Sequence, residues 1–406
     1  MRRKGNMLTT YKGLPSEIYI LFVARIINCL GNFVYPLLAL ILTQKIGMTP
    51  KNAGLIVTLM AVSQVPSLMI GGKVADSIGR KKVIIIFQTL GGFFYLVCGF
   101  MKPSIFVIII IVIAANCYSM AAPAYDAMIA DITTPQNRKS SYSLLYMGMN
   151  IGVSVGPIMA GYLFKDYLSL LFIGDAITSF LSIIIIYIFI KETTSSKNVV
   201  IDKGRELEKY EEGSVISVLL KRPIILYFSI IMLVYSFSYS QWSFTLPLQM
   251  AALFKGSGAK FYGFVASING FVVIIFTPII TTLLHKVKAL KVIAIGGIFY
   301  AVSFGMFGVI SKLPMFFISI FIMTIGEILI STNHGTFIAN NTPSSHRGRI
   351  NAILPIITGA GYAFGPAVMG NVSNSFGYTV TWTIISILMV IGVIGNGLLS
   401  IRHNES

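Results

Sequence analysis

The sequence predicts an all-α membrane protein whose twelve transmembrane helices form two bundles of six. Hydrophobic residues make up 55% of the 406 residues and charged residues only 11%, and the mean hydropathy is +0.81. Stretches without Asp, Glu, Lys or Arg recur along the whole chain, and one bilayer crossing needs about 20 apolar residues in a helix. One long hydrophilic stretch, residues 192–222, divides these apolar stretches into two sets of six.

The boundaries of the helices follow from the charges and turn residues that flank each apolar stretch. Residues 350–401 contain no charged side chain and are too long for one span, so the Gly, Asn and Ser residues of 370–377 supply a dividing turn. We expect helices at residues 16–43, 52–76, 82–101, 104–131, 139–164, 168–191, 223–253, 259–285, 290–311, 314–341, 347–370 and 378–401. The expected parts are an amino-terminal segment (1–15), a first bundle (16–191), a linker (192–222), a second bundle (223–401) and a tail (402–406).

The Lys and Arg residues are concentrated in alternate loops. If the amino terminus is cytoplasmic, 23 of the 31 lie in inner segments and 7 in outer segments, while Arg25 lies within a helix. By the positive-inside rule, we expect a multi-pass protein of the cell membrane (plasma or inner membrane) with both termini in the cytoplasm. The net charge of +17 then faces anionic lipid, and nucleic acid is not an expected partner.

Several function classes lack their sequence signals. Cys29, Cys98 and Cys117 all lie in apolar segments, which gives neither a disulfide framework nor a metal-ligand spacing. The chain has no phosphate-binding glycine loop followed by Lys-Ser/Thr, no catalytic constellation and no cytoplasmic domain large enough to hydrolyse ATP. The amino terminus lacks the short apolar core and cleavage site of a signal peptide. We therefore expect that the protein is not an enzyme and needs no cofactor. Transport would then be driven by an ion gradient.

The two halves of the chain repeat each other. With a shift of 209 residues, Gly152, Gly156, Pro157 and Gly161 fall on Gly361, Gly365, Pro366 and Gly370, and Arg138 falls on Arg347. Two like-oriented bundles predict a binding site at the membrane midplane, exposed alternately to each side as the bundles rock. We expect a monomer whose partners are a small-molecule substrate, protons and the lipid bilayer.

The charged loop at residues 72–82 carries a family signature. Gly72, Asp76, Gly79 and Arg80 have the spacing that resembles the loop between helices 2 and 3 of the major facilitator superfamily, although Ser77 stands where that family usually has Arg. The resemblance implies the major facilitator fold, an ion pair of Arg80 with an acidic residue of helix 4, and a latch that shuts the inner side. Asp131 fits that acidic position better than the deeper Asp126. From the charges alone, an ordinary basic loop is the alternative.

Small residues follow each other at close spacing in the fifth predicted helix. Gly148, Gly152, Gly156, Pro157 and Gly161 let this helix approach a neighbour closely, and Pro157 bends it. The segment is similar to the helix-5 signature of antiporters in the superfamily, which implies drug/proton antiport. Helix packing alone is the alternative.

Four charged side chains lie within the predicted spans: Arg25, Asp126, Asp175 and Glu327. Each costs about 2.5–3.5 kcal/mol on insertion scales and therefore needs a reason to be there. Glu327 is the sharpest candidate for proton coupling, because burial favours its neutral form and lets it take up and release a proton. A fixed ion pair with Arg25 is the alternative. His334, seven residues on, could relay protons or only hydrogen-bond, and Asp175 is expected to be structural.

Polar and aromatic residues in the middle of the helices predict a cavity for a partly apolar, cationic ligand. They are Asn28, Asn32, Tyr35, Gln64, Asn116, Tyr118, Gln241, Trp242 and Asn269. Polar contacts between helices are the alternative for each of them. Trp382 is expected in the outer interfacial belt.

Taken together, these features predict proton-coupled efflux of amphipathic small molecules or drugs. Uptake of a small metabolite such as a sugar or nucleoside, by symport or facilitated diffusion, and lipid translocation are the alternatives. The sequence does not identify the substrate, because cavity shape depends on tertiary packing.

Overall fold

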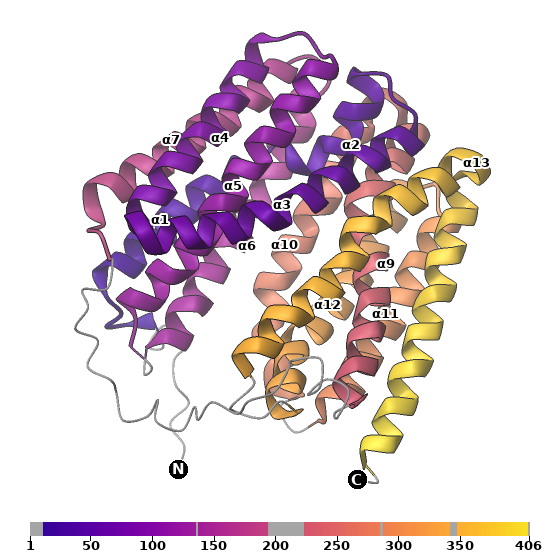
Figure 1. Ribbon diagram of the computed structural model, residues 1–406. Helices are drawn as coiled ribbons and strands as arrows, with labels where there is room; N and C mark the ends of the chain where they lie inside the picture. Colours follow the sequence, from indigo (N-terminus) through magenta and orange to yellow (C-terminus); the bar gives the residue numbers. More distant parts are fainter. Residues whose placement is uncertain (1–10, 135–136, 194–222, 285–286, 342–346, 405–406) are drawn as a thin grey trace. The chain divides into compact units, whose positions relative to one another are not determined.

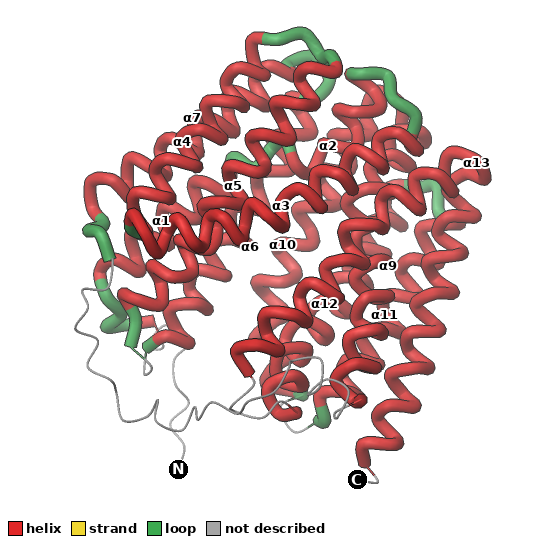
Figure 2. The backbone as a smooth tube through the Cα atoms, in the orientation of Figure 1, coloured by secondary structure: helices red, strands yellow, loops and turns green. Residues whose placement is uncertain are grey.

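A computed structural model describes residues 11–134, 137–193, 223–284, 287–341 and 347–404 (Figure 1). Most of the predicted linker, the first ten residues and the last two lie outside the described residues. Every regular element in the described part is helical, as Figure 2 shows.

The first half of the chain begins with a broken span. It consists of α1 (Ser16–Leu30), the short turn η2 (Tyr35–Leu37), α2 (Leu38–Leu40) and η3 (Ile41–Lys45). Five continuous helices follow: α3 (Pro50–Ile78), α4 (Arg80–Phe100), α5 (Ile105–Ile132), α6 (Arg138–Leu163) and α7 (Leu168–Phe189).

The second half contains long helices with two internal breaks. It consists of α9 (Pro223–Phe254), the turn η5 (Lys255–Ser257), α10 (Gly258–Leu283), α11 (Ala289–Val309), α12 (Leu313–Asn341) and α13 (Arg347–Asn404). Within α13, Gly377 alone has a non-helical backbone, with φ 78° and ψ 176°.

These helices account for twelve membrane crossings. Ten segments of the described chain are long and apolar enough to cross a membrane. Two of them, Pro223–Leu283 with 61 residues and Ile356–Ile401 with 46, are each long enough for two crossings. The break at η5 divides the first of these, and the break at Gly377 divides the second. The predicted fold class is confirmed.

Two local predictions need correction. The dividing turn lies within the expected stretch 370–377 but is confined to Gly377, because the chain is helical up to Phe376. The expected helix at 16–43 is interrupted between Leu30 and Tyr35, where the Phe33 N–H bonds to the Gly31 carbonyl instead of continuing the helical pattern. A tertiary contact of α7, described below, occupies this second break.

The chain forms two compact units. The first contains the described parts of Met1–Gly47, Leu59–Asn198 and Ala259–Phe271. The second contains the described parts of Met48–Thr58, Val199–Gly258 and Val272–Ser406. The start of α3 therefore packs within the second unit, and the start of α10 packs within the first.

Packing within each unit depends on a limited set of helix pairs. In the first unit α1 packs on α6 and α7, and α4 packs on α5 and α7; in the second, α13 packs on α9 and α11, and α11 on α12. Between 28% and 56% of the most apolar window of each span is buried within the protein. Large apolar side chains such as Ile188, Phe100 and Val309 occupy the exposed faces, as expected for helices that contact lipid.

The sequence predicted that Trp382 lies in the outer interfacial belt, and this prediction was wrong. The Trp382 side chain is fully buried, and its indole N–H donates to Gln249 Oε1 at 2.7 Å. The Gln249 amide in turn donates to the Phe307 carbonyl at 2.6 Å. The Trp382 side chain is therefore part of the core of the second unit.

Candidate functional site

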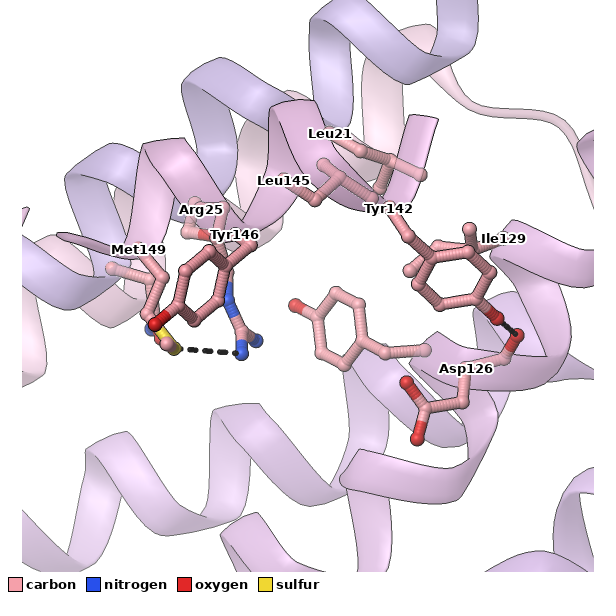
Figure 3. A pocket seen from close by; sticks show the side chains of 11 residues that line it. Leu21, Arg25, Asp126, Ile129, Tyr142, Leu145, Tyr146 and Met149 are labelled. Carbon is pink, nitrogen blue, oxygen red and sulfur yellow. Dashed lines mark hydrogen bonds between the residues drawn. The ribbon is translucent and has the colours of Figure 1, made fainter. Parts of the chain in front are cut away.

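A cavity of about 180 Å³ surrounds Arg25 in the first unit. Its lining comes from α1, α5, α6 and α7, namely Leu21, Arg25, Asn28, Tyr125, Asp126, Ile129, Tyr142, Leu145, Tyr146, Met149 and Ser182. Figure 3 shows the Arg25 guanidinium beside Tyr146 and Met149, where it donates to the Met149 sulfur at 3.8 Å. Arg25, Asn28 and Asp126, three residues predicted from the sequence, thus share one cavity.

Asp126 lies on the other side of this cavity from Arg25 (Figure 3). The Tyr142 hydroxyl donates to the Asp126 main-chain oxygen at 3.3 Å, which leaves the carboxylate oxygens to the cavity. Within the described part of the chain, Arg80 forms ion pairs with Asp76 and Asp131, whereas Arg25 and Asp126 do not approach each other within 4.0 Å. Arg25 and Asp126 therefore present opposite charges to one tyrosine-lined space without closing it by a direct pair.

A second cavity, of about 370 Å³, surrounds Glu327 in the second unit. Helices α9, α11, α12 and α13 line it through Met232, Tyr235, Ser236, Tyr239, Tyr300, Glu327, Ile330, Ser331, His334 and Thr358. Glu327 is half-buried, and the Tyr239 side chain makes a hydrogen bond with it. The predicted proton-coupling residues Glu327 and His334 therefore line the same cavity.

Aromatic rings dominate the wall around Glu327. Tyr239 and Tyr300 stack with centroids 5.8 Å apart, and Trp242 lies 6.1 Å from Tyr239. His334 stacks on Phe228 at 5.5 Å, two helical turns from Glu327. A carboxyl group flanked by aromatic faces is a suitable environment for a cation.

The close approach of α11 and α12 fixes the position of Glu327. A Cβ atom on Gly326 would lie 2.7 Å from the Gly296 carbonyl, and one on Gly296 would lie 2.9 Å from the Gly326 carbonyl. Only glycine at both positions permits this contact. The side of α12 at Gly326 is thus covered by α11.

The charged loop forms a small ionic cluster at the start of α4. Arg80 Nε lies 3.2 Å from Asp131, and Arg80 Nη2 lies 3.4 Å from Asp76. The Asp131 side chain is 23% exposed and the Asp76 side chain 75%, so the pair with Asp131 is the better protected one. Gly79, with φ 106°, makes the tight turn between α3 and α4, and Gly72 lies one turn before Asp76.

The glycines of α6 contact α1 and α10. A Cβ atom on Gly148 would meet Phe22, one on Gly152 would meet Cys29, and one on Gly156 would meet the Leu30 carbonyl, all within 2.8 Å. Gly161 lies against the backbone at Ala259, and Pro157 is within the helix. These residues pack helices together, and their implied role in antiport stays a prediction.

The other predicted cavity residues lie outside these two cavities. Asn116 donates to Ser63 at 3.0 Å and accepts from Ser67 at 2.7 Å, which joins α5 to α3. Gln241 is fully buried and bonds Ser240 and Thr245 of its own helix. The remaining ones are Asn32 and Tyr35 at the break in the first span, half-buried Gln64, Tyr118 on α5 and buried Asn269.

Sequence reasoning missed the tyrosines of both cavities. Tyr142 and Tyr146 are four residues apart on α6, and Tyr235 and Tyr239 are four residues apart on α9. Residues at this spacing share a helix face. Tyrosine pairs at i and i+4 within apolar spans are thus the signal that could have identified these walls.

Comparison with known families decides what kind of protein this geometry belongs to. The profile of the Major Facilitator Superfamily matches residues 21–288 and 244–405. The chain belongs to the Major Facilitator Superfamily. It is accordingly a multi-pass secondary transporter and not an enzyme.

The superfamily member most informative about ions is a Na⁺, Li⁺, K⁺/H⁺ antiporter of Planococcus maritimus. It is 23% identical over 395 residues, which cover 86% of this chain and 91% of the relative. A class H tetracycline resistance protein of Pasteurella multocida is 25% identical over 215 residues, covering 52% of this chain and 53% of the relative. The quinolone resistance protein NorA of Staphylococcus aureus is 27% identical over 155 residues, covering 37% and 39%.

Solved superfamily structures share the fold at low sequence identity. A mutant of the peptide transporter POT in complex with sulfate superposes with a TM-score of 0.78 at 16% identity, over 97% of this chain and 96% of that one. The nucleoside transporter NupG gives a TM-score of 0.76 at 14% identity, over 95% and 99%. These similarities support the fold and leave the substrate open.

Proposed function

We propose that this transporter exports amphipathic, positively charged small molecules in exchange for protons, with the proton gradient as its energy source. It works by alternating access in the cell membrane, as a monomer with both termini in the cytoplasm. The charged loop around Arg80 and Asp131 acts as a latch in this cycle.

The observation that carries the proposal is the carboxyl of Glu327 within a tyrosine-lined cavity. Tyr239 and Tyr300 present aromatic surface beside it, which favours an organic cation over an anion. The same carboxyl accepts a proton, so proton and cationic substrate compete for one negative charge. Mutually exclusive binding of two ligands is the requirement for exchange, because each then shifts the affinity for the other.

The relatives support export of drugs. Two of them are named for resistance to tetracycline and quinolones, and one is named as a cation/proton antiporter. Export of a drug against its gradient is one way in which a membrane transporter can confer resistance. His334, on the same helix and in the same cavity as Glu327, provides a route for the proton.

The first prediction concerns Glu327→Gln. The amide cannot exchange a proton, so cells with this variant should lose concentrative export of a cationic dye while still allowing the dye to equilibrate. The measurement is dye efflux from energised cells with and without a protonophore. Glu17→Gln, an identical change in the first turn of α1 and outside both cavities, should leave export unchanged. Uphill export by Glu327→Gln would show that another group carries the coupling proton.

A second candidate function is exchange of inorganic monovalent cations for protons. It is favoured by the antiporter of Planococcus maritimus, which matches 86% of this chain, whereas the two resistance proteins match 52% and 37%. Everted vesicles that contain a pH indicator distinguish the two functions. Proton release on adding Na⁺ or K⁺ supports exchange of metal cations, whereas proton release on adding the cationic substrate dye supports drug export. Proton-driven accumulation of a sugar or nucleoside in whole cells would favour uptake instead.

A further inference from the structure

Asp175 is a buried carboxyl group that the proposed cycle does not use. Asp175 lies in α7 and is 8% exposed to solvent. No Lys, Arg or His among the described residues lies within 4.0 Å of its carboxylate. The Val34 N–H donates to Asp175 Oδ2 at 3.3 Å, and the Phe33 backbone also approaches the carboxylate. The donors thus come from the break in the first span.

The break and α7 are in close contact on either side of Asp175. A Cβ atom on Gly31 would collide with the Thr178 side chain, and one on Gly174 would lie 2.7 Å from the Phe33 ring. The last turn of α1 ends at Leu30 beside this contact. Since the carboxyl end of a helix carries partial negative charge, it adds to the negative potential of Asp175 and attracts a cation.

Two further oxygen atoms at this place have unused hydrogen-bonding capacity. Ser179 lies one turn after Asp175 on the same face of α7 and is fully buried. The Tyr118 hydroxyl of α5 lies next to Ser179 and within electrostatic range of Asp175. The Tyr118 and Ser179 hydroxyls are within hydrogen-bonding range of each other, and neither bonds to any other described residue. A hydroxyl oxygen has two lone pairs, so the pair can still offer oxygen ligands to a small cation beside Asp175.

The other titratable groups that face this position are neutral ones. Tyr95 of α4 lies within electrostatic range of Asp175, and its ring is 5.6 Å from that of Tyr118. Cys98 of α4 and Tyr35 of η2 also face Tyr95. The surroundings thus combine one carboxylate, neutral hydroxyls and backbone donors. Such a set offers one negative charge and several oxygen ligands to a small cation.

We propose that Asp175, together with the hydroxyls of Tyr118 and Ser179, binds a small monovalent cation at the break in the first span. The cation is a proton or a sodium-sized metal ion, and both neutralise the carboxylate through oxygen atoms. Binding weakens the bond between Asp175 and the Val34 N–H, so the break loosens when the site is occupied. The site is distinct from the Glu327 cavity. Its part in coupling rests on the proposed antiport, whereas cation binding itself does not.

The experiment measures thermal unfolding of the purified full chain in lipid nanodiscs, followed by tryptophan fluorescence. One series varies sodium at fixed pH, with choline keeping the ionic strength constant, and a second varies pH at fixed sodium. A ligand that binds only the folded state raises the unfolding temperature as its concentration increases. Wild-type protein should therefore become more stable with sodium, or with falling pH, and Asp175→Asn should lose that component.

Two controls make the result specific. Asp166→Asn, the same change in the exposed segment just before α7, should keep the full cation dependence. Glu327→Gln should also keep the Asp175-dependent component, so failure of the proposed export mechanism is distinguishable from failure of this site. A sodium response identifies the metal ion, and a response to pH alone identifies the proton.

Milder variants cover the case in which Asp175→Asn does not fold. Ser179→Ala and Tyr118→Phe keep the carboxylate and its backbone bonds, and each should weaken the apparent cation affinity by about tenfold or more. The proposal is overturned if Asp175→Asn retains the wild-type response to both cations. It is equally overturned if the two hydroxyl variants leave the response unchanged.

Discussion

Three carboxyl side chains of this transporter have different neighbours and therefore different chemistry. Asp131 faces the Arg80 guanidinium at 3.2 Å, Glu327 faces tyrosine side chains, and Asp175 faces backbone N–H groups. A guanidinium holds a carboxylate in an ion pair, whereas aromatic walls leave it able to exchange one cation for another. The identity of the neighbour, more than the depth in the membrane, decides what each carboxyl can do.

A pair of variants separates the structural and gating parts of the charged loop. Asp131→Asn removes the better-protected partner of Arg80 and should lower the free energy of unfolding by about 1–3 kcal/mol. Asp76→Asn, whose side chain is 75% exposed, should change stability by less than about 1 kcal/mol. Thermal unfolding of the two purified variants provides the measurement.

Transport assays on the same variants test the latch. We expect Asp76→Asn to slow dye export although the protein remains folded, because the resemblance implies that the loop containing Asp76 acts as a latch that shuts the inner side during the cycle. Unchanged export by Asp76→Asn would exclude that gating role.

Residue by residue, the sequence indicated charged groups better than the surfaces around them. A charge in an apolar span is conspicuous, so Arg25, Asp126 and Glu327 could be selected without a structure, and all three line cavities. Tyrosines such as Tyr146 and Tyr239 are common in membrane helices, and their side chains become a binding wall only through the packing of other helices. Gln241 was selected for its polarity, but its bonds to Ser240 and Thr245 place it in helix packing.

Among the elements, the packing of α1 against α6 depends most directly on glycine positions, which have no side chain. At Gly152 the backbones are so close that a Cβ atom would lie 2.6 Å from Cys29 Cβ and 2.7 Å from the Leu30 nitrogen. Backbone atoms cannot move aside as the end of a side chain can. The small-residue spacing of α6 is therefore a packing requirement, whatever else it contributes to exchange.

Gly152→Ala should consequently destabilise the protein by about 1–3 kcal/mol through overpacking. Gly359→Ala is the matched control, because a Cβ atom there has no neighbour within 4 Å. In a helix, Gly→Ala at an open position should be neutral or stabilise by up to about 1 kcal/mol. Thermal unfolding of the two purified variants checks this, and an equal response of both would contradict the packing argument.

The element boundaries show what local sequence can and cannot predict. Helices such as α4 and α11 follow directly from apolar length bounded by charges, since hydrocarbon leaves no other way to satisfy the backbone. The break after Leu30 could not be predicted in the same way, because the group that satisfies its Val34 N–H is Asp175, 141 positions away in sequence. Likewise, the turn residues of 370–377 indicated a break in α13, but nothing local showed that Gly377 alone would form it.

For the molecule as a whole, the distribution of charge predicts its orientation. Of the 31 Lys and Arg residues, most lie in segments that would face the cytoplasm. The positive-inside rule then places Lys102 outside and Lys288 inside. Both residues are exposed in the structure, so both can report their side of the membrane.

Single cysteines test this orientation in a variant whose three native cysteines are replaced. Lys102→Cys should react with a membrane-impermeant maleimide in intact cells, and Lys288→Cys should react only after permeabilisation. The reverse pattern would invert the topology, and with it the assignment of export and uptake. Labelling of both positions in intact cells would mean that the loops do not alternate.

The whole fold was predictable because two independent patterns agree, the twelve apolar spans and the repeat at a shift of 209 residues. The substrate was not, because members of one superfamily with the same fold include peptide and nucleoside transporters. What distinguishes them is the lining of cavities, which tertiary packing creates.

The single-residue break in α13 has a consequence for how the protein is made. Gly377 has a backbone conformation that is essentially restricted to glycine, and it joins two membrane-spanning helices without any intervening loop. Two such helices emerge in direct succession during synthesis, with no polar loop between them. We therefore expect them to insert as one hairpin, so that the two halves of α13 join the bundle as a pair.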